Sequence, residues 1–231
     1  MGLPAAEPVR RLSSAVASID TLLDGGWPRG RLSEITGPPS SGKTSLVLAL
    51  LAATTRRGDV VACVDPIDAW HPASIARAGA DLQRVLWVRP PSATDAVWCT
   101  ELLLRAGGFA LVVLDFGTAM PRRLRGHTWP RLMHAAEHAH TAVVVLAPQR
   151  VAGSFSTLSL AVQARTTRWQ PGAWPLFEGF DSRVELTRNK LGAAGRSAIV
   201  ECCSASIDFR RSSLDTAPEK MGPTRDERRK T

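Results

Sequence analysis

One stretch decides the fold of this chain: Gly37-Pro38-Pro39-Ser40-Ser41-Gly42-Lys43-Thr44. It satisfies the pattern G-x-x-x-x-G-K-[ST], in which glycines let backbone N–H groups turn inward around phosphate oxygens. We expect the ammonium group of Lys43 to contact the β and γ phosphates of a nucleotide, and the Thr44 hydroxyl to ligate Mg²⁺. We count Ser45, the next residue, with the loop. The sequence therefore predicts a nucleoside triphosphate site at these residues.

The residues on both sides of this loop support the prediction. Residues 31–36 have the character of a strand, and residues 43–57 carry apolar side chains at helical spacing, among them Leu46 and Leu50. A helix that begins near Lys43 directs the positive end of its dipole at a bound anion. A strand, a glycine-rich loop and a helix in this order distinguish a phosphate loop from an ordinary glycine turn.

The rest of the chain alternates short apolar runs with helical stretches. Strands are predicted at 60–64, 85–88, 111–114 and 142–146, and helices at 72–78, 94–105 and 129–140. This alternation implies right-handed crossovers and a parallel sheet. After Val151 the helices stop, and strands joined by turns are predicted at 162–169, 183–188 and 197–202. The predicted fold class is α/β, a mostly parallel sheet flanked by helices with antiparallel strands at its C-terminal edge.

Length and composition suit one globular domain. The chain has 231 residues, of which 44% are hydrophobic and 22% charged. We expect residues 1–11 to be a flexible segment, 12–206 to form the nucleotide-binding domain, and 207–231 to be a disordered, charged tail. No apolar run reaches the roughly 20 residues that span a bilayer, and the N-terminus lacks an apolar signal core. We therefore expect a cytoplasmic protein with no membrane partner.

A second residue of the nucleotide site is predicted at the end of an apolar run. Asp115 follows Leu111-Val112-Val113-Leu114, which suits a buried parallel strand. A carboxylate at the carboxyl end of such a strand can hold Mg²⁺ through water. The alternative is an aspartate that only caps the turn after the strand.

Beyond the phosphate loop, the chain resembles the RecA family in several segments, which occur in the correct order between about residues 12 and 203. The earlier segments are Ser18-Ile19-Asp20, Leu22-Leu23, Gly25-Gly26, Pro28-Arg29-Gly30-Arg31, Glu34-Ile35 and Val64-Asp65. The later segments are Pro148-Gln149-Arg150 and Arg188-Asn189-Lys190-Leu191. The resemblance implies a RecA-like P-loop core that binds ATP and Mg²⁺ through the loop and Asp115.

This chain departs from RecA at the catalytic position. Ile67 stands where RecA carries the glutamate that activates water. An aliphatic side chain can neither orient nor deprotonate a water molecule. Asp68 and Gln149 remain as candidate catalytic residues, so we expect a weak ATPase at most. The loop after Gln149 is also much shorter than the DNA-binding loop of RecA.

This reduced form is similar to the ImuA family, RecA-like accessory proteins of bacterial translesion synthesis. The likeness is carried by the trimmed core, by Pro148-Gln149-Arg150, and by Gly153-Ser154-Phe155 with the leucines after it. It implies a role in the SOS response to DNA damage, beside a Y-family polymerase partner and an error-prone replicative-type polymerase. RecA itself is a further candidate partner, and association with the nucleoid after DNA damage is expected.

The charge of the chain favours nucleic acid as a ligand. The formal net charge is +8 and the sequence pI about 10.3. Arg122, Arg123 and Arg125 occupy the place of the first DNA-binding loop of RecA, and Arg150 follows the next strand. We predict that these four arginines contact the phosphates of single-stranded DNA. The alternatives are a solvated loop and an arginine content that reflects genomic base composition.

Arg188 and Lys190 match a Lys-Asn-Lys element that, in RecA, reaches the nucleotide of a neighbouring subunit. Residues two apart on a strand share one face, so both cations can approach one phosphate cluster. The resemblance implies a contact in trans to a second subunit or a partner. The alternative is a local salt bridge with Glu185 or Asp181.

Near the same end of the chain, aromatic side chains gather in a segment rich in glycine and proline. They are Trp169, Trp174, Phe177 and Phe180. The segment is either a docking patch or a loop that folds back over the sheet.

Two functions stand out among those considered. The first is a nucleotide-binding accessory protein of DNA-damage tolerance that docks polymerases, RecA or DNA. The second is an active DNA-dependent ATPase and recombinase that forms filaments on single-stranded DNA, against which Ile67 argues. A small-molecule kinase would need a lid with arginines, and a binding module with a vestigial loop conflicts with intact Lys43, Thr44 and Asp115.

Overall fold

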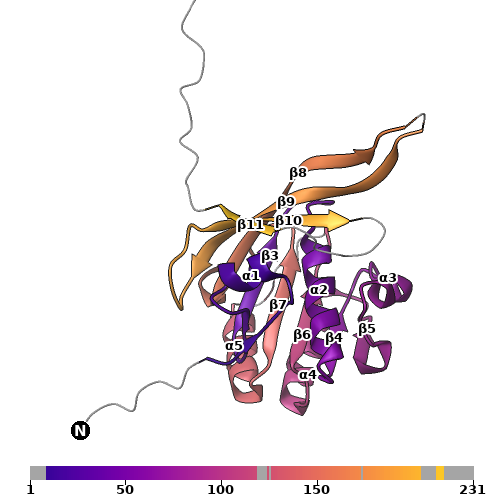
Figure 1. Ribbon diagram of the computed structural model, residues 1–231. Coiled ribbons are helices and arrows are strands. Elements are labelled where there is room, and N and C mark those ends of the chain that lie inside the picture. The colour runs from indigo at the N-terminus through magenta and orange to yellow at the C-terminus, as the bar shows by residue number, and fades with distance from the viewer. Residues whose placement is uncertain (1–8, 119–123, 125, 173, 204–211, 216–231) are drawn as a thin grey trace, which may run out of the picture.

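The computed structural model describes residues 9–118, 124, 126–172, 174–203 and 212–215 (Figure 1). Within these residues the main sheet has nine strands in the order β11-β10-β9-β8-β3-β7-β6-β4-β5. The parallel part consists of β8 (Leu158–Gln170), β3 (Leu32–Thr36), β7 (Ala142–Ala147), β6 (Leu111–Asp115), β4 (Val61–Val64) and β5 (Val85–Val88).

The antiparallel part extends this sheet on the far side of β8. It consists of β9 (Leu176–Asn189), β10 (Ser197–Cys203) and β11 (Ser212–Asp215). Two short strands, β1 (Arg11–Leu12) and β2 (Trp27–Pro28), pair separately from it. The predicted fold class, a mostly parallel α/β sheet with antiparallel strands at the C-terminal edge, is confirmed.

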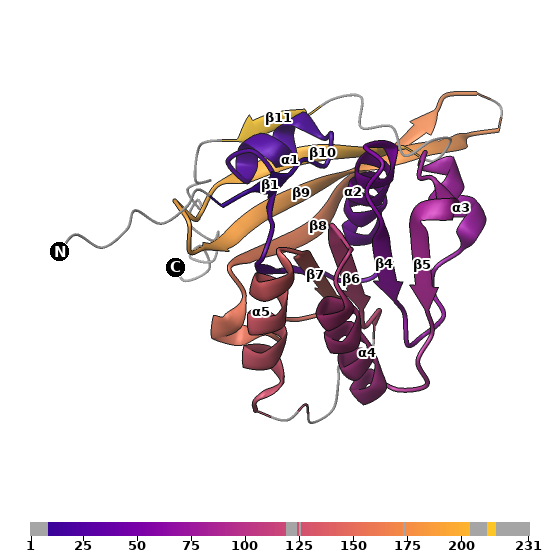
Figure 2. The same cartoon turned by 90° about the horizontal axis from the view of Figure 1, so that it is seen from below.

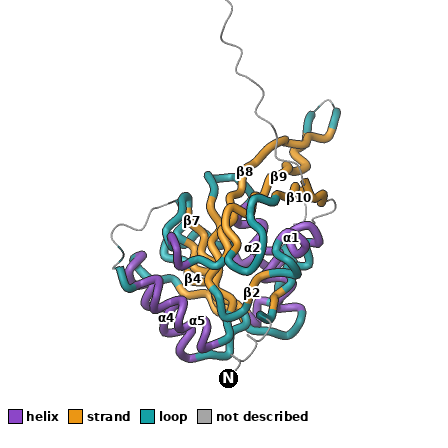
Figure 3. The backbone as a smooth tube through the Cα atoms, turned by 90° about the vertical axis from the view of Figure 1, so that its left-hand side faces the viewer, coloured by secondary structure: helices purple, strands orange, loops and turns teal. Residues whose placement is uncertain are grey.

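Helices cover both faces of the sheet (Figures 2 and 3). They are α1 (Ala17–Leu22), α2 (Lys43–Arg56), α3 (Pro72–Arg77), α4 (Ala93–Ala106) and α5 (Thr128–Ala139), with single 3₁₀ turns η1 (Leu82–Arg84) and η2 (Gly153–Phe155). Strand β6 shows how the core divides, because successive side chains of a strand point to opposite faces. Leu111 and Val113 pack with α1 and α2, whereas Val112 and Leu114 pack with α4 and α5.

Strands β8 and β9 are longer than the sequence predicts. The predicted ranges were 162–169 and 183–188, and both strands extend well beyond them. Residues 163–167 are exposed, so their side chains carry no alternation of buried and exposed positions. Backbone pairing between β8 and β9 keeps this region extended, and such pairing does not require any pattern of polar and apolar side chains.

The outer halves of β8 and β9 form a hairpin that projects away from the body of the molecule (Figure 1). The rings of Trp169 and Phe177 stack edge to face with centroids 5.3 Å apart, and the side chain of Trp174 is 87% exposed. Trp169, Trp174 and Phe177 therefore do not fold back over the sheet, whereas Phe180 is half-buried beside Gly42; a docking role for the exposed aromatic residues stays a prediction.

Short strands lie near both ends of the predicted nucleotide-binding domain. Arg11, the last residue of the segment 1–11 that we predicted to be flexible, belongs to β1 and pairs with Pro28. Ser212–Asp215 pairs with β10 as β11, so the prediction of a disordered tail over 207–231 does not hold for these four residues. The remainder of that tail lies outside the described residues. Within the described part of the chain, no helix combines the length and apolar character needed to cross a bilayer.

Candidate functional site

The phosphate loop lies between the carboxyl end of β3 and the amino end of α2, as predicted. Gly42 caps α2 with φ of +95°, a conformation that favours glycine. No side chain within the described residues caps this helix end. The first backbone N–H groups of α2 therefore remain available for an anion.

Strands β8 and β9 form the wall behind the loop. A Cβ atom on Gly42 would lie 2.5 Å from the Ser182 hydroxyl of β9, and one on Gly37 would collide with the Val162 carbonyl of β8. The Ser182 hydroxyl also donates a hydrogen bond of 2.7 Å to the carbonyl oxygen of Ser41. The two glycines are thus required for the close approach of the loop to the sheet.

Lys43 is buried at the centre of the loop. Its ammonium group donates to the carbonyl oxygen of Gly37 at 2.8 Å and lies 3.5 Å from that of Gly117. Burial lowers the pKa of Lys43, and the negative charge of Asp115 partly counteracts this effect. A lysine that is short of charged partners is well suited to receive phosphate oxygens.

Asp115 lies at the carboxyl end of β6, and its side chain is 4% exposed. Its Oδ1 accepts a hydrogen bond from Gly117 N at 2.7 Å, and its Oδ2 accepts one from the indole Nε1 of Trp70 at 2.9 Å. Burial raises the pKa of Asp115, and the hydrogen bonds from Gly117 and Trp70 oppose this rise. These contacts make Asp115 more than a cap of the following turn.

A second buried carboxylate lies at the end of the neighbouring strand β4. Asp65 is fully buried and accepts hydrogen bonds from the backbone N–H groups of Ile67 and Trp70 at 3.3 and 3.0 Å. The indole Nε1 of Trp87 donates to it at 3.3 Å. Its negative charge contributes to the raised pKa of Asp115.

The residues of the loop fit a nucleotide with Mg²⁺. Within the described residues, the hydroxyl oxygen of Ser41 is buried without a hydrogen-bond partner, which leaves it free for a ligand atom. Thr44 and Ser45 begin α2 beside Lys43, and Thr44 is exposed at the mouth of the loop. Bound Mg²⁺ would neutralise phosphate charge, with the Thr44 hydroxyl and the Asp115 carboxylate as its protein contacts.

Of the residues considered for catalysis, Ile67 lies beside the phosphate loop, and Asp68 and Gln149 are exposed. Ile67 packs so closely on Gly117 that a Cβ there would collide with its side chain, and Gly117 in turn contacts Lys43. Asp68 is 61% exposed and lies 3.4 Å from the guanidinium group of Arg89. Gln149 is exposed in the bend after β7. The side chain beside the phosphate loop is therefore aliphatic, and the Asp68 carboxylate is engaged with an arginine.

The short segment after β7 is fixed by a buried glutamate that the sequence analysis left without a role. Glu34 on β3 is fully buried, and its Oε1 accepts hydrogen bonds from Val151 N at 2.6 Å and Ala152 N at 2.9 Å. Arg150 lies 3.7 Å from its Oε2 and also donates to the carbonyl oxygen of Gly153 at 2.9 Å. Arg150, predicted to contact nucleic acid, therefore also has a structural partner.

Arg188, near the end of β9, and Lys190, just after it, reach the same segment. Arg188 donates to the carbonyl oxygen of Gly153 at 3.0 Å, and Lys190 to that of Ser154 at 2.5 Å. The two cations therefore contact the same short segment, Gly153-Ser154. Their partners within the described residues are carbonyl oxygens, and the alternative of a salt bridge with Glu185 or Asp181 is not supported. The three arginines of the predicted DNA-binding loop, Arg122, Arg123 and Arg125, lie outside the described residues.

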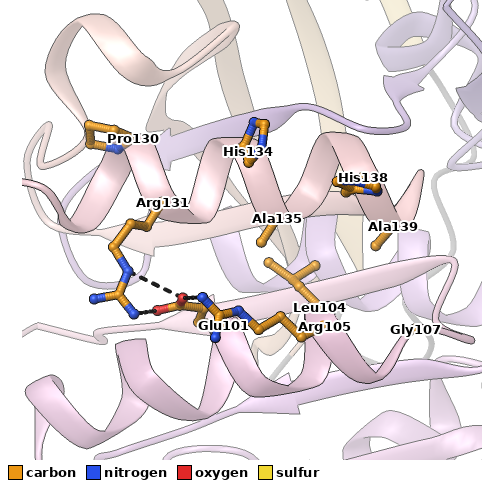
Figure 4. Close-up of a pocket in the computed structure, with 10 residues that line it drawn as sticks. All are labelled: Glu101, Leu104, Arg105, Gly107, Pro130, Arg131, His134, Ala135, His138 and Ala139. Carbon is orange, nitrogen blue, oxygen red and sulfur yellow. Dashed lines mark hydrogen bonds and ion pairs between the residues drawn. The ribbon is translucent and has the colours of Figure 1, made fainter.

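A separate cavity of about 590 Å³ lies between α4 and α5 (Figure 4). Its apolar lining includes Leu104 and Ala135, and the carboxylate of Glu101 lies at one end, held by Arg105 at 2.7 Å and Arg131 at 2.5 Å. No residue of the phosphate loop lines it. One carboxylate therefore faces two guanidinium groups at this end, which leaves a net positive charge of one there.

Sequence reasoning missed three groups that shape the site: Asp65, Trp70 and Ser182. Asp65 at the end of an apolar run gave the same signal as Asp115 and could have been assigned. Nothing in the sequence places the indole of Trp70 against Asp115, or the hydroxyl of Ser182 under the loop, because both contacts depend on the order of the strands.

Comparison with known proteins agrees with this geometry. Residues 1–126 match the family described as RecA N-terminal domain. Protein RecA of Prochlorococcus marinus (strain MIT 9211) is 37% identical over 115 residues, which are 50% of this chain and 31% of that protein. Protein RecA of Chlorobaculum parvum (strain DSM 263 / NCIMB 8327) is 37% identical over 113 residues, 48% of this chain and 33% of that protein. The matches thus span about a third of the length of these curated relatives.

Among solved structures, the chain is similar to one described as the crystal structure of the RadB recombinase. The TM-score is 0.65 and the sequence identity 22%, over 83% of this chain and 96% of that chain. At this identity the likeness shows the fold alone.

Proposed function

This chain belongs to the RecA N-terminal domain family, and on that premise we propose that it is a Mg²⁺·ATP-binding accessory protein of the bacterial DNA-damage response. It binds ATP through the loop that contains Lys43 and hydrolyses it weakly or not at all. Nucleotide binding prepares it to dock on partners. RecA is the partner that family membership supports, and single-stranded DNA is a further ligand.

The observation that carries the proposal is the position of Ile67. A nucleotide site with an intact lysine and a buried carboxylate can bind Mg²⁺·ATP, whereas rapid hydrolysis needs a group that positions and deprotonates water. At this site the side chain packed on Gly117, beside Lys43, is the aliphatic one of Ile67. The nearest carboxylate in sequence, Asp68, contacts Arg89.

The narrower role that we propose is in translesion synthesis during the SOS response. It rests on the resemblance of the reduced core, of Pro148-Gln149-Arg150 and of Gly153-Ser154-Phe155 to the ImuA family. The partners in this role are a Y-family polymerase and an error-prone replicative-type polymerase, together with RecA, at the nucleoid of a damaged cell. The short segment after β7, held by Glu34, supports a docking role in place of a long DNA-binding loop.

The alternative function is an active DNA-dependent ATPase and recombinase that forms filaments. Family membership and the exposed Gln149 after β7 favour it. Two measurements on the purified chain separate the alternatives: ATP turnover with and without single-stranded DNA, and sedimentation of the same mixtures. The accessory role predicts tight ATP binding, slow turnover that DNA barely changes, and a monomer or small oligomer. Rapid DNA-stimulated turnover together with long homofilaments would replace it by the recombinase.

The partner and DNA contacts need separate tests. Capture with the tagged chain from DNA-damaged cells should recover the two polymerases by mass spectrometry, and the Lys43→Ala chain should recover them less well. For DNA, replacement of Arg122, Arg123 and Arg125 by alanine should flatten the salt dependence of binding, by about 0.7–0.9 in slope for each lost phosphate contact. An unchanged slope would mean that these arginines are only solvated.

A further inference from the structure

Trp70 forms hydrogen bonds to two buried carboxylates. Its indole Nε1 donates to Oδ2 of Asp115 at 2.9 Å, and its backbone N donates to Oδ2 of Asp65 at 3.0 Å. Asp115 ends β6, and Asp65 directly follows β4, the neighbouring parallel strand. One residue therefore connects the ends of two adjacent strands through their acidic side chains.

The bond to Asp115 fixes the rotation of its carboxylate. Gly117 N holds one oxygen at 2.7 Å, and Trp70 holds the other, so the plane of the group is set from both sides. Each carboxylate oxygen can accept a second contact after these bonds are made. Outer contacts of this kind orient metal-binding carboxylates in proteins.

Packing alone does not account for this contact. Trp27 is also fully buried, yet within the described residues its indole nitrogen has no hydrogen-bond partner. Burial of a tryptophan in this chain therefore does not by itself bring its N–H group to an acceptor. Trp70, by contrast, directs its N–H group at the one carboxylate that belongs to the nucleotide site.

From these contacts we propose that Trp70 is a positioning residue, whose indole N–H holds the Asp115 carboxylate in the orientation that receives the Mg²⁺ of a bound nucleotide. The inference rests on the proposed function and deepens it. Asp65 accepts from both Trp70 N and Ile67 N, so Trp70 and Ile67 belong to one hydrogen-bonded turn after β4.

The test compares the dissociation constant of ATP with excess Mg²⁺ and with EDTA, measured by titration calorimetry on the full chain. The ratio of the constant in EDTA to the constant in Mg²⁺ isolates the contribution of the metal. Trp70→Phe should reduce this ratio about tenfold, the lower end of the effect of outer-shell substitutions on metal affinity. The affinity for ATP in EDTA should change less than about twofold, since the substitution leaves the metal-independent contacts to the nucleotide in place.

Two controls make the result specific. Trp87→Phe removes an indole that donates to Asp65 and should leave the ratio unchanged. In an Asp115→Asn background, Trp70→Phe should have no further effect on the ratio, because Trp70 acts through that carboxylate.

If Trp70→Phe fails to fold, replacement of Trp70 by benzothienylalanine provides the same test, since sulfur takes the place of the N–H group in a ring of nearly the same shape. A folded variant that keeps the full Mg²⁺ ratio overturns the role of Trp70. A parent chain that binds ATP without any Mg²⁺ dependence, or does not bind it, refutes the proposed function itself, and the role of Trp70 with it.

Discussion

The hydroxyl of Ser182 donates a hydrogen bond of 2.7 Å to the carbonyl oxygen of Ser41, across 141 residues of sequence. Ser41 belongs to the phosphate loop, and Ser182 lies in the middle of the long antiparallel strand β9. The same hydroxyl is the atom that a Cβ on Gly42 would approach to 2.5 Å. The antiparallel extension is therefore a structural part of the nucleotide site.

Lys43→Ala should weaken binding of Mg²⁺·ATP about tenfold or more. The substitution removes the cation that we expect on the β and γ phosphates, and a charge-assisted hydrogen bond contributes about 1.5–3 kcal/mol. Titration calorimetry measures the effect. Lys190→Ala is the matched control, because that lysine contacts the carbonyl oxygen of Ser154 and not the loop. Equal affinity of the Lys43 variant and the parent would disprove the assignment.

Ile67→Glu should raise ATP turnover about tenfold or more above a parent rate well below the enzyme median of about 10 s⁻¹. The new carboxylate would lie against Gly117, where it can reach a water beside the phosphates. Steady-state phosphate release measures the rate. Ile67→Gln supplies a side chain of similar size without a base and should gain far less. A fast parent enzyme whose rate does not depend on Asp68 would contradict this prediction.

Glu34→Ala should lower the free energy of unfolding by about 3 kcal/mol. The change leaves two backbone N–H groups, those of Val151 and Ala152, without their buried acceptor, and each such group costs about 1–3 kcal/mol. Urea denaturation measures the loss. Glu137→Ala breaks an exposed ion pair with Arg31 and should cost less than about 1 kcal/mol. Similar losses in the two variants would show that the Glu34 contacts contribute little.

The double substitution Arg188→Ala and Lys190→Ala should weaken nucleotide-dependent capture of RecA or a polymerase. Both cations lie on one side of the segment after β7, where a partner's phosphates could approach them together. The comparison is capture by parent and double variant, each with and without Mg²⁺·ATP. Identical capture under all four conditions would exclude a contact in trans. The two residues would then serve only to hold the carbonyl groups of Gly153 and Ser154.

Asp24 should contribute to stability in a pH-dependent way. The hydrogen bond from Arg196 is the main cause that lowers the pKa of Asp24 below its ordinary 3.8. The contribution is therefore present above pH 3.8 and is lost as the pH falls through the lowered pKa. Asp24→Asn should cost no more than about 1 kcal/mol at neutral pH, since the pair is exposed. Urea unfolding at several pH values measures the difference from the parent, which should shrink in acid; a constant difference would contradict the assignment.

Much of the parallel core could be predicted from the sequence, because its strands are continuous apolar runs and its phosphate loop has a fixed spacing. Leu111-Val112-Val113-Leu114 before Asp115 is an example of such a run. The outer halves of β8 and β9 could not be predicted, because backbone pairing maintains the strands there while their side chains are exposed. The contacts of Trp70 and Ser182 with the site were equally inaccessible, because they are set by which strands become neighbours.

Strand β9 also connects three separate parts of the molecule. Phe177, near the start of β9, belongs to the projecting aromatic hairpin, and Ser182 in its middle supports the phosphate loop. Arg188, near the end of β9, forms a hydrogen bond to the segment after β7. At about 3.4 Å per residue the first two are about 17 Å apart and the last two about 20 Å. Because β9 is one continuous strand, a single element joins the support of the phosphate loop to the projecting hairpin on one side and to the segment after β7 on the other.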